Sequence, residues 1–402
     1  AITCFSSYKD NLLVGADGGG LNIQQGKGNN FIVDKNLGKI VLDIKPENGN
    51  GLFWIATWDN GLYLYDFPQK KVIKHYKSDE KEMDHSLPTE RINYILVEKD
   101  FVWIATDGKG VALLNKKTGE ITSSNNSEKD PFNINNSKFI THLMKDSEGW
   151  LWISSSEGLR KYKNGQQINF SYSEKPGDLP QNQITMCMED KEKRVWIITS
   201  TGSLVSYDRK ANVFINYAET TDIPENLKFI TSDKQNNLWI GSQDEIIQFN
   251  PDAKKLKHYS LEKELERNFL YQKSVYLHPN GEIYFGSNDG MFKFNPTRLA
   301  GQDKSPKIYL KDIYIWDKKQ EIGKSEILSR SLNCTDTIRI NHKQNYFTLE
   351  YVGIDLEKSE SLHYSYFLKG LHHDWIEAGK ERKVSFTNLE PGTYTFLVRV
   401  KS

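Results

Sequence analysis

The chain has 402 residues, and its 53 Lys and Arg balance 53 Asp and Glu, so the formal net charge at pH 7 is zero. This length favours two domains, or a repeat array followed by a domain. A nucleic-acid-binding protein usually carries a basic excess, which this sequence lacks, and we expect no nucleic acid as a partner. No apolar run reaches the ~18 residues of a membrane span, and the first residues do not form a signal peptide.

Cysteine usage indicates neither a disulfide framework nor a metal site. Cys4, Cys187 and Cys334 are widely spaced, odd in number and form no C-x-x-C motif. We expect all three to behave as small buried hydrophobic residues.

A repeat built around a Trp-containing strand runs through the first 300 residues. One clear copy is Phe53-Trp54-Ile55-Ala56-Thr57 followed by Gly61, and another is Leu238-Trp239-Ile240-Gly241-Ser242. The copies lie 41 to 49 residues apart, and the positions equivalent to the Trp are Leu13, Trp54, Trp103, Trp152, Trp196, Trp239 and Tyr284. Seven copies of one supersecondary unit predict a closed repeat architecture.

Each copy contains an apolar strand before the Trp strand, and one or two strands after it. The segments alternate with a period of two residues and show no helical stripe. Four antiparallel strands in 40–50 residues is the size of a propeller blade, so we predict a seven-bladed β-propeller over residues 1–300, with the Trp side chains in the cores between blades. The predicted first strands of the copies are Ile2–Phe5, Ile40–Ile44, Ile92–Val97, Phe139–Met144, Ile184–Met188, Phe229–Thr231 and Ser274–Leu277.

Residues 305–402 have a different pattern, with alternating strand-like segments separated by turn residues. The number of strands favours an Ig-like β-sandwich. We expect Trp375 to lie in its core. The sandwich is expected to be truncated near Ser402, where a final strand would follow.

The Trp strand followed by Gly and by Tyr-Asp, as in Tyr65-Asp66 and Tyr207-Asp208, resembles the two-component regulator propeller repeat. The segments Asn345–Tyr351 and Tyr364–Gly370 resemble the Y_Y_Y domain that follows such propellers. The all-β order of propeller and sandwich is therefore similar to the periplasmic sensor region of hybrid two-component systems of Bacteroidetes.

The resemblance implies a role and a setting. It implies a sensor that binds oligosaccharides from glycan breakdown and relays a signal across the inner membrane to regulate transcription. It also implies an upstream propeller, a downstream membrane helix and histidine kinase, and a homodimer. We therefore expect the chain to be a periplasmic part of a longer protein, with no enzymatic activity in this region.

Motifs for catalysis or for cofactors do not occur in the sequence. Asp17-Gly18-Gly19-Gly20 is rich in glycine, but no helix follows it to receive a phosphate. His372-His373-Asp374 is the densest group of imidazole and carboxylate, and we interpret it as a surface loop. We predict no catalytic residues, no metal and no cofactor.

The candidate ligand site lies in the turns between second and third strands and in the crossings between blades, which share one face of a propeller. Trp58 breaks the repeat there, because other copies carry polar or small residues in that turn. An exposed Trp among Asp and Asn suits stacking against a sugar, and the alternative is packing against the loop 77–89. The candidate residues are Trp58, Asp59, Asn60, His85, Arg91, Asp107, Lys109, Glu157, Asp244 and Asp289.

Three functions remain open at this point. The first is the oligosaccharide-sensing domain that the resemblance implies. A scaffold for protein interactions is the alternative, since propellers present flat faces to partners. A polysaccharide-cleaving propeller enzyme is the third, although no pair of carboxylates stands out.

Overall fold

The structure, a computed structural model, describes residues 1–24, 26, 28, 30–79, 85–124, 138–217, 222–243, 245–261, 269–299, 307–324, 327–354 and 362–401. The chain divides into two compact units, Ala1–Leu299 and Ala300–Ser402. Among the predicted site residues, Asp244 lies outside the described residues.

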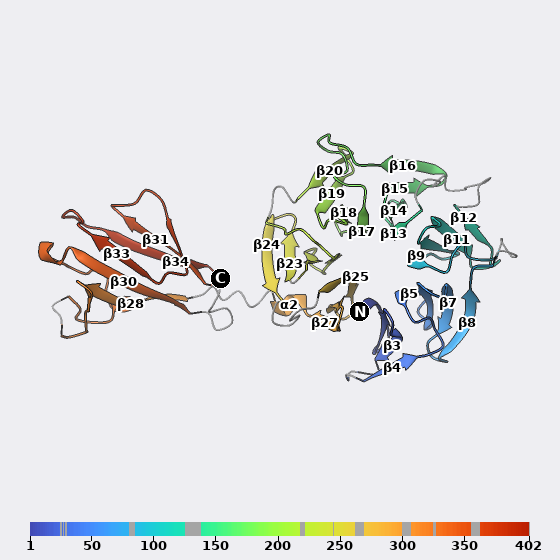
Figure 1. Ribbon diagram of the computed structural model, residues 1–402, viewed down its shortest axis with the longest axis horizontal. Coiled ribbons are helices and arrows are strands. Elements are labelled where there is room, and N and C mark those ends of the chain that lie inside the picture. Colours follow the sequence, from blue (N-terminus) through green and yellow to red (C-terminus); the bar gives the residue numbers. More distant parts are fainter. Residues whose placement is uncertain are drawn as a thin grey trace. The chain divides into compact units, whose positions relative to one another are not determined.

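The first unit is a ring of seven antiparallel sheets, six with four strands and the last with three strands in its described part. Figure 1 shows these sheets as blades around a central axis. We number the blades 1 to 7 in chain order. The fold is the predicted seven-bladed β-propeller.

The strands of each blade follow one another from the axis outwards. The innermost strands are β1 (Ile2–Tyr8), β5 (Val41–Pro46), β9 (Ile92–Val97), β13 (Ile140–Lys145), β17 (Ile184–Glu189), β21 (Phe229–Ser232) and β25 (Leu270–Leu277). The second strands are β2 (Asn11–Ala16), β6 (Leu52–Thr57), β10 (Phe101–Thr106), β14 (Leu151–Ser155), β18 (Val195–Thr199), β22 (Leu238–Gly241) and β26 (Ile283–Ser287).

The outer half of each blade is shorter and more polar. The third strands are β3 (Gly20–Gln24), β7 (Leu62–Asp66), β11 (Val111–Asn115), β15 (Gly158–Lys163), β19 (Leu204–Asp208), β23 (Glu245–Asn250) and β27 (Met291–Phe294). The outermost strands are β4 (Phe31–Asp34), β8 (Lys71–Tyr76), β12 (Ile121–Ser123), β16 (Gln166–Phe170), β20 (Val213–Asn216) and β24 (Lys255–Ser260). A short helix, α2 (Pro296–Leu299), follows the last blade.

The repeated Trp strand is buried on both faces because each blade is packed between two others. Every residue of β14, β18 and β26 is buried, and Trp152, Trp196 and Trp239 have no exposed surface. The outermost strand β8 is mostly exposed, because one of its edges faces solvent.

The buried indoles have a polar partner that the sequence interpretation did not identify. The indole Nε1 donates to a carboxylate six residues earlier, in the turn between the first and second strands: Trp152 to Asp146 at 2.7 Å, Trp196 to Asp190 at 2.9 Å and Trp239 to Asp233 at 2.8 Å. The same carboxylates accept backbone N–H groups of their turns. One Asp therefore holds both the hairpin and the core side chain.

The turn between second and third strands is held by the residue that ends the second strand. The hydroxyl of Thr57 donates to the carbonyl of Gly61 at 2.8 Å, and Thr106 makes the same bond to Gly110 at 2.6 Å. Gly61 has a φ of +76°, and a Cβ there would lie 2.2 Å from the carbonyl oxygen of Tyr76. A side chain at this position would therefore clash with strand β8.

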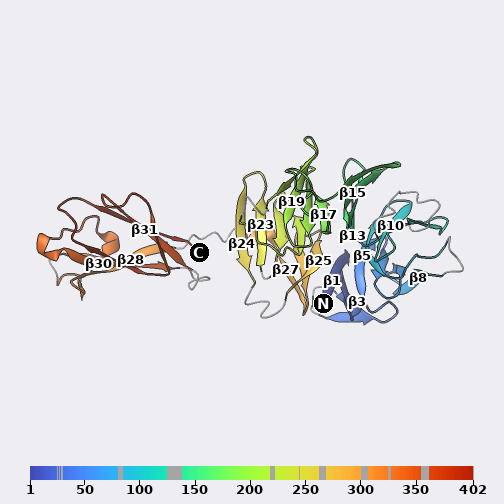
Figure 2. The same ribbon diagram turned by 45° about the horizontal axis from the view of Figure 1, so that its top comes forward.

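The ring closes by side-chain packing between blade 1 and blade 7. Strand β1 packs against β25 and β26. The ring centroids of Phe5 and Tyr284 lie 6.2 Å apart, and the hydroxyls of Ser7 and Tyr276 are hydrogen-bonded at 2.7 Å. We call this blade 1–blade 7 interface the closure seam; N in Figures 1 and 2 marks its blade 1 side.

The second unit is a β-sandwich of two sheets. One sheet has the order β29 (Lys318–Lys319), β28 (Lys307–Ile315), β30 (Tyr346–Ile354) and β33 (Lys383–Thr387); the other has β32 (Ile376–Gly379), β31 (His363–Lys369) and β34 (Thr395–Lys401). Two 3₁₀ turns, η1 (Leu332–Cys334) and η2 (His342–Gln344), lie between β29 and β30. Tyr351 and Tyr364 are among the most buried side chains of its core, and the predicted β-sandwich is confirmed.

Two expectations for individual side chains were wrong. Trp375 is 38% exposed, and the guanidinium of Arg399 lies 4.3 Å from its ring centroid, so it is a surface residue. Cys4 and Cys187 are buried, but Cys334 is exposed, because it lies at the end of the short 3₁₀ turn η1.

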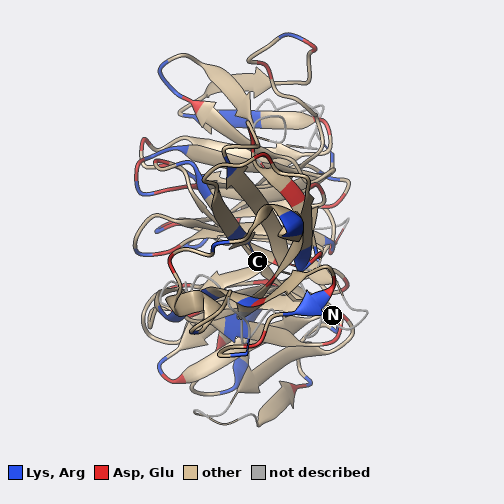
Figure 3. Cartoon of the chain, turned by 90° about the vertical axis from the view of Figure 1, so that its left-hand side faces the viewer, with Lys and Arg blue, Asp and Glu red and all other residues tan. Residues whose placement is uncertain are grey.

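Charges of both signs are interspersed over the view in Figure 3, as the equal numbers of acidic and basic residues suggested. Among the described residues, no helix is both long and apolar enough to cross a membrane.

Candidate functional site

A cavity of about 720 Å³ lies on the axis of the propeller. It is lined mainly by the innermost strands of six blades, among them Asp43 and Lys45 of β5, Asn93 and Tyr94 of β9, and His142 of β13. Asp17, Trp58 and Asn288 also line it, and they come from the turns between second and third strands. The volume is in the range that binds small molecules.

Trp58 lies where the cavity meets the turn face of the propeller. Its backbone N–H donates to the carbonyl of Ile40 at 3.0 Å, which ties the turn of blade 2 to the start of β5. The indole lines the cavity, and the guanidinium of Arg91 lies 5.5 Å from its ring centroid. The structure therefore brings together Trp58 and Arg91, two of the predicted site residues.

Asp59 and Asn60, which follow Trp58, serve the turn itself. The carboxylate of Asp59 accepts the backbone N–H of Lys39 at 3.1 Å and that of Ile40 at 3.3 Å. The Asn60 N–H donates to Thr57 Oγ1 at 3.1 Å, and its carbonyl is 2.8 Å from His75 Nε2. These contacts fix the loop that carries Trp58.

The other predicted residues that the structure describes do not line the cavity. His85 is exposed and lies beside Gly119, in the hairpin turn between β11 and β12. The backbone N–H of Asp107 donates to the carbonyl of Arg91. Lys109, Glu157 and Asp289 are exposed on turns of blades 3, 4 and 7. Their role in ligand binding stays a prediction.

A column of polar groups that the sequence interpretation missed crosses the inner strands. Lys45 Nζ lies 3.1 Å from Asp43 Oδ1 and 4.3 Å from the ring centroid of Tyr94. The rings of Tyr94 and His142 are 4.1 Å apart. Burial would lower the pKa of Lys45, but the Asp43 carboxylate and the Tyr94 hydroxyl hold it above its ordinary value.

His142 is kept neutral by the same surroundings. Burial lowers the pKa of His142 well below its ordinary value, and the positive charges of Lys273 and Lys45 lower it further. Its Nδ1 faces the backbone N–H of Cys187 at 3.5 Å and the thiol at 3.8 Å. Burial also raises the pKa of the Cys187 thiol to about 12, so this cysteine is not a nucleophile at neutral pH.

The innermost strands carry irregularities that turn side chains towards the neighbouring blade. In blades 1 to 5, a register shift leaves one residue of the first strand without a partner on the second: Thr3, Leu42, Asn93, Thr141 and Thr185. The Asn93 side chain donates to the Ile140 carbonyl at 2.9 Å, and the Thr141 hydroxyl to the Ile184 carbonyl at 2.6 Å. These bulges join consecutive blades around the cavity.

Blade 7 departs from this pattern. Leu270 pairs with Ser287 and Val275 with Phe285, so four residues, 271–274, face the single Gly286 on the neighbouring strand. Three of them, Tyr271, Gln272 and Lys273, line the cavity. We call residues 271–273 the blade 7 bulge; the predicted first strand of this copy, Ser274–Leu277, began too late to include it.

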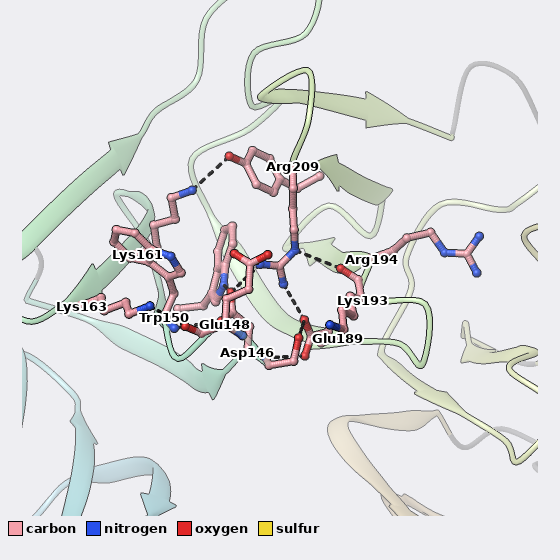
Figure 4. A network of polar contacts seen from close by, with 12 residues as sticks. Asp146, Glu148, Trp150, Lys161, Lys163, Glu189, Lys193, Arg194 and Arg209 are labelled. Carbon is pink, nitrogen blue, oxygen red and sulfur yellow. Dashed lines mark hydrogen bonds and ion pairs between the residues drawn. The ribbon is translucent and has the colours of Figure 1, made fainter.

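A second polar cluster, shown in Figure 4, belongs to the scaffold. The guanidinium of Arg209 contacts three carboxylates, Asp146 at 3.0 Å, Glu148 at 3.0 Å and Glu189 at 2.5 Å. Lys161 Nζ lies 5.1 Å from the ring centroid of Trp150. The charges of Arg209 and Lys161 have partners within the protein, and none of the residues named here lines the cavity.

Metal chemistry has no candidate here, since the described ranges contain no group of three or more His, Cys, Asp or Glu side chains placed to hold an ion. In the His372-His373-Asp374 segment, which we interpreted as a surface loop, His372 Nδ1 accepts the backbone N–H of Leu368 at 3.1 Å, while His373 and Asp374 are exposed. The interpretation of this group as a surface loop agrees with its position.

The fold and cavity thus define a β-propeller with an axial small-molecule-sized site, joined to a β-sandwich. Residues 355–402 match the family model of the Y_Y_Y domain, so the sandwich contains a Y_Y_Y domain.

The whole chain is similar to parts of longer proteins. It is 27% identical over 98% of its length to histidine kinase P4 of Formosa agariphila, of which it covers 29%. Among solved structures, the extracellular domain of the hybrid two-component system BT3049 from B. thetaiotaomicron has a TM-score of 0.74 at 21% identity, over 100% of this chain and 53% of that one.

A third similarity shows that the fold does not determine the role. PorZ, a surface component of the type IX secretion system of Porphyromonas gingivalis, has a TM-score of 0.53 at 16% identity and is matched over 99% of this chain and 58% of its own. The solved structures support the propeller and sandwich, and the kinase similarity identifies a relative of which this chain spans less than a third.

Proposed function

We propose that this chain is the ligand-sensing, extracytoplasmic region of a hybrid two-component sensor, and that it binds an oligosaccharide in the axial cavity at Trp58. The observation that carries the proposal is the cavity itself, with an indole at its turn-face end and polar groups of several blades inside it. An aromatic face beside hydrogen-bonding groups suits a pyranose ring, whose apolar face stacks while its hydroxyls find donors and acceptors.

The relatives support the proposed setting. A Y_Y_Y domain, the similarity to a histidine kinase and the fold of an extracellular domain together favour a periplasmic position as part of an inner-membrane protein. In the full-length protein an upstream propeller, a membrane helix and a kinase would complete the pathway, and a homodimer would relay the signal. Ligand binding shifts such a pathway only if the ligand binds the two signalling states with different affinity.

The test is the substitution Trp58→Ala, measured by calorimetry against a panel of neutral and acidic oligosaccharides. Loss of the stacking face is expected to weaken the affinity for the bound sugar about tenfold or more. Trp150→Ala is the matched control, because Trp150 also stacks on a cation, Lys161 at 5.1 Å, but does not line the cavity.

Unchanged affinity in Trp58→Ala would remove Trp58 from the site. Equal loss in Trp150→Ala would show that the effect comes from the stability of the propeller. Turnover of a glycan by the wild-type chain would replace the sensor proposal by the enzyme, and binding of a protein but of no sugar would favour the scaffold.

A further inference from the structure

The axial cavity carries more positive than negative charge. Its charged lining residues are Lys45, Lys228, Lys273, Asp17 and Asp43. Both carboxylate oxygens of Asp43 already have partners: Oδ1 accepts the N–H of Ile44 and contacts Lys45, and Oδ2 accepts the N–H of Ile95 at 3.0 Å. Neither Lys228 nor Lys273 forms an ion pair with any residue that the structure describes, so the cavity holds cationic groups without a carboxylate partner.

Lys273 is the most unusual of these lysines. It lies in the blade 7 bulge with a φ of +60°, a backbone conformation that residues with a Cβ seldom adopt. Its Nζ reaches from blade 7 to blade 4, where it donates to the carbonyl oxygen of Thr141 at 3.0 Å. The bulge thus places an ammonium group at the cavity, where its hydrogen-bond partner among the described residues is a neutral carbonyl oxygen.

A strained backbone conformation at a partly buried, charged side chain is costly, and such features concentrate at functional sites. A bulge whose only task was to fill the axis could do so with an apolar side chain. The positive φ and the partly buried ammonium group, which reaches across the cavity to Thr141, are two separate observations, and both concern Lys273.

We propose that the blade 7 bulge is an anion-recognition element, and that Lys273 binds the carboxylate or sulfate group of an acidic sugar in the axial cavity. This inference rests on the proposed function and narrows it from oligosaccharides in general to acidic ones. A carboxylate or sulfate accepts charge-assisted hydrogen bonds from an ammonium group, which are stronger than those to a neutral hydroxyl. Lys228 supplies a second positive charge in the same lining.

Binding of an anion is coupled to the protonation of Lys273. Burial lowers the pKa of this lysine to about 8, with Asp43 acting in the opposite direction. The other titratable groups that line the same cavity are Cys4, Asp17, Lys45, Tyr94, His142, Lys228, Tyr271 and Tyr276. A bound anion favours the ammonium form, so binding near pH 8 takes up protons, and affinity falls as the pH rises above 8.

The experiment compares sugars that differ in charge on one ring. Galacturonate, digalacturonic acid and galactose 6-sulfate are titrated by calorimetry into the wild-type chain, with galactose and galactobiose as neutral counterparts. At least one acidic sugar is expected to bind about tenfold or more tightly than its neutral counterpart. Titrations at pH 8 in two buffers of different ionisation enthalpy are expected to show proton uptake for that acidic sugar only.

Two variants test the residue, and a third is the control. Lys273→Met is expected to abolish the preference for the acidic sugar and the proton uptake, whereas Lys273→Arg keeps the preference and loses the proton uptake, because arginine stays charged. Both keep a residue with a Cβ at the strained position, so neither changes the backbone preference. Lys255→Met, at an exposed lysine of β24, is the control and leaves both properties unchanged.

The outcomes separate this inference from the proposed function. Equal binding of acidic and neutral sugars, or an acidic preference that persists in Lys273→Met, overturns the anion site while oligosaccharide sensing at Trp58 stands. Failure of all these sugars to bind the folded wild-type chain also overturns the anion site. Failure of the wider oligosaccharide panel as well overturns sugar sensing.

Discussion

Asp233 illustrates how a single carboxylate supports a blade. It is 3% exposed and accepts the backbone N–H groups of Gln235 and Asn237, both at 2.9 Å, in addition to the indole of Trp239. Without the carboxylate, the indole N–H is left buried and unpaired, and the turn loses its acceptor.

We therefore expect Asp233→Ala to lower the free energy of unfolding by about 3 kcal/mol, measured by urea denaturation. Asp233→Asn, which keeps an acceptor, is expected to lose less. Asp252→Ala is the control, because its carboxylate is largely exposed and its interaction with Arg194 contributes about 1 kcal/mol or less. Equal losses in Asp233→Ala and Asp252→Ala would contradict the role of the Trp–Asp pair.

His142 makes the stability of the propeller depend on pH. Its pKa in the folded chain is lowered well below the ordinary value of 6.5, chiefly by burial. Between the two values the unfolded chain binds the proton and the folded chain does not, so stability is lost as the pH falls below 6.5. The loss has a limiting slope of about 1.4 kcal/mol per pH unit for one such group.

His142→Gln cannot be protonated, and we expect its stability to fall less steeply than that of the wild type between neutral pH and pH 5. The measurement is the free energy of unfolding of both proteins at a series of pH values. Because every other titrating group is shared, parallel curves for the two proteins would show that His142 does not act in this way.

At the scale of the strand and the blade, the repeat was predictable because both faces of the Trp strand are buried. Leu238-Trp239-Ile240 has the same environment in blade 6 that Leu151-Trp152-Ile153 has in blade 4, so the same residues recur. The blade 7 bulge was not predictable in this way. Tyr271-Gln272-Lys273 has no alternation, since its residues depart from the pleat and one has a positive φ.

The candidate site also combines residues that the sequence could identify with residues that it could not. Trp58 could be identified because it is an exception within a repeated turn, and the structure places it against Arg91 at the cavity. Asp43, Lys45 and His142 lie in innermost strands, where a polar residue looks like the solvent-facing half of an ordinary strand. The signal that could have found them is a charged residue in the strand nearest the axis, which faces the cavity and not bulk solvent.

For the propeller as a whole, the closure seam is the interface between neighbouring blades that no direct crossing of the chain joins. Phe5, 5% exposed, packs there against Tyr284. We expect Phe5→Ala to cost about 3–5 kcal/mol, as a large buried aromatic does, and to raise hydrogen exchange in β1 and β25 above that in other inner strands.

Phe214→Ala is the matched control, because Phe214 is 7% exposed and belongs to β20 of blade 5, away from the seam. We expect it to destabilise the propeller without the selective exchange in β1 and β25. Uniform exchange across the inner strands of Phe5→Ala would show that the seam does not open before the rest of the ring.

Strand β25 has two neighbours of different kinds: the cavity, which its bulge enters, and β1, against which it packs across the closure seam. Most inner strands of the ring lie between blades that the chain joins directly. Strand β25 instead borders the closure seam, where no direct crossing of the chain joins the two blades. A ligand bound at the blade 7 bulge would therefore also act on the packing at the closure seam. Ligand binding in the axial cavity and the packing of β1 against β25 would then be coupled.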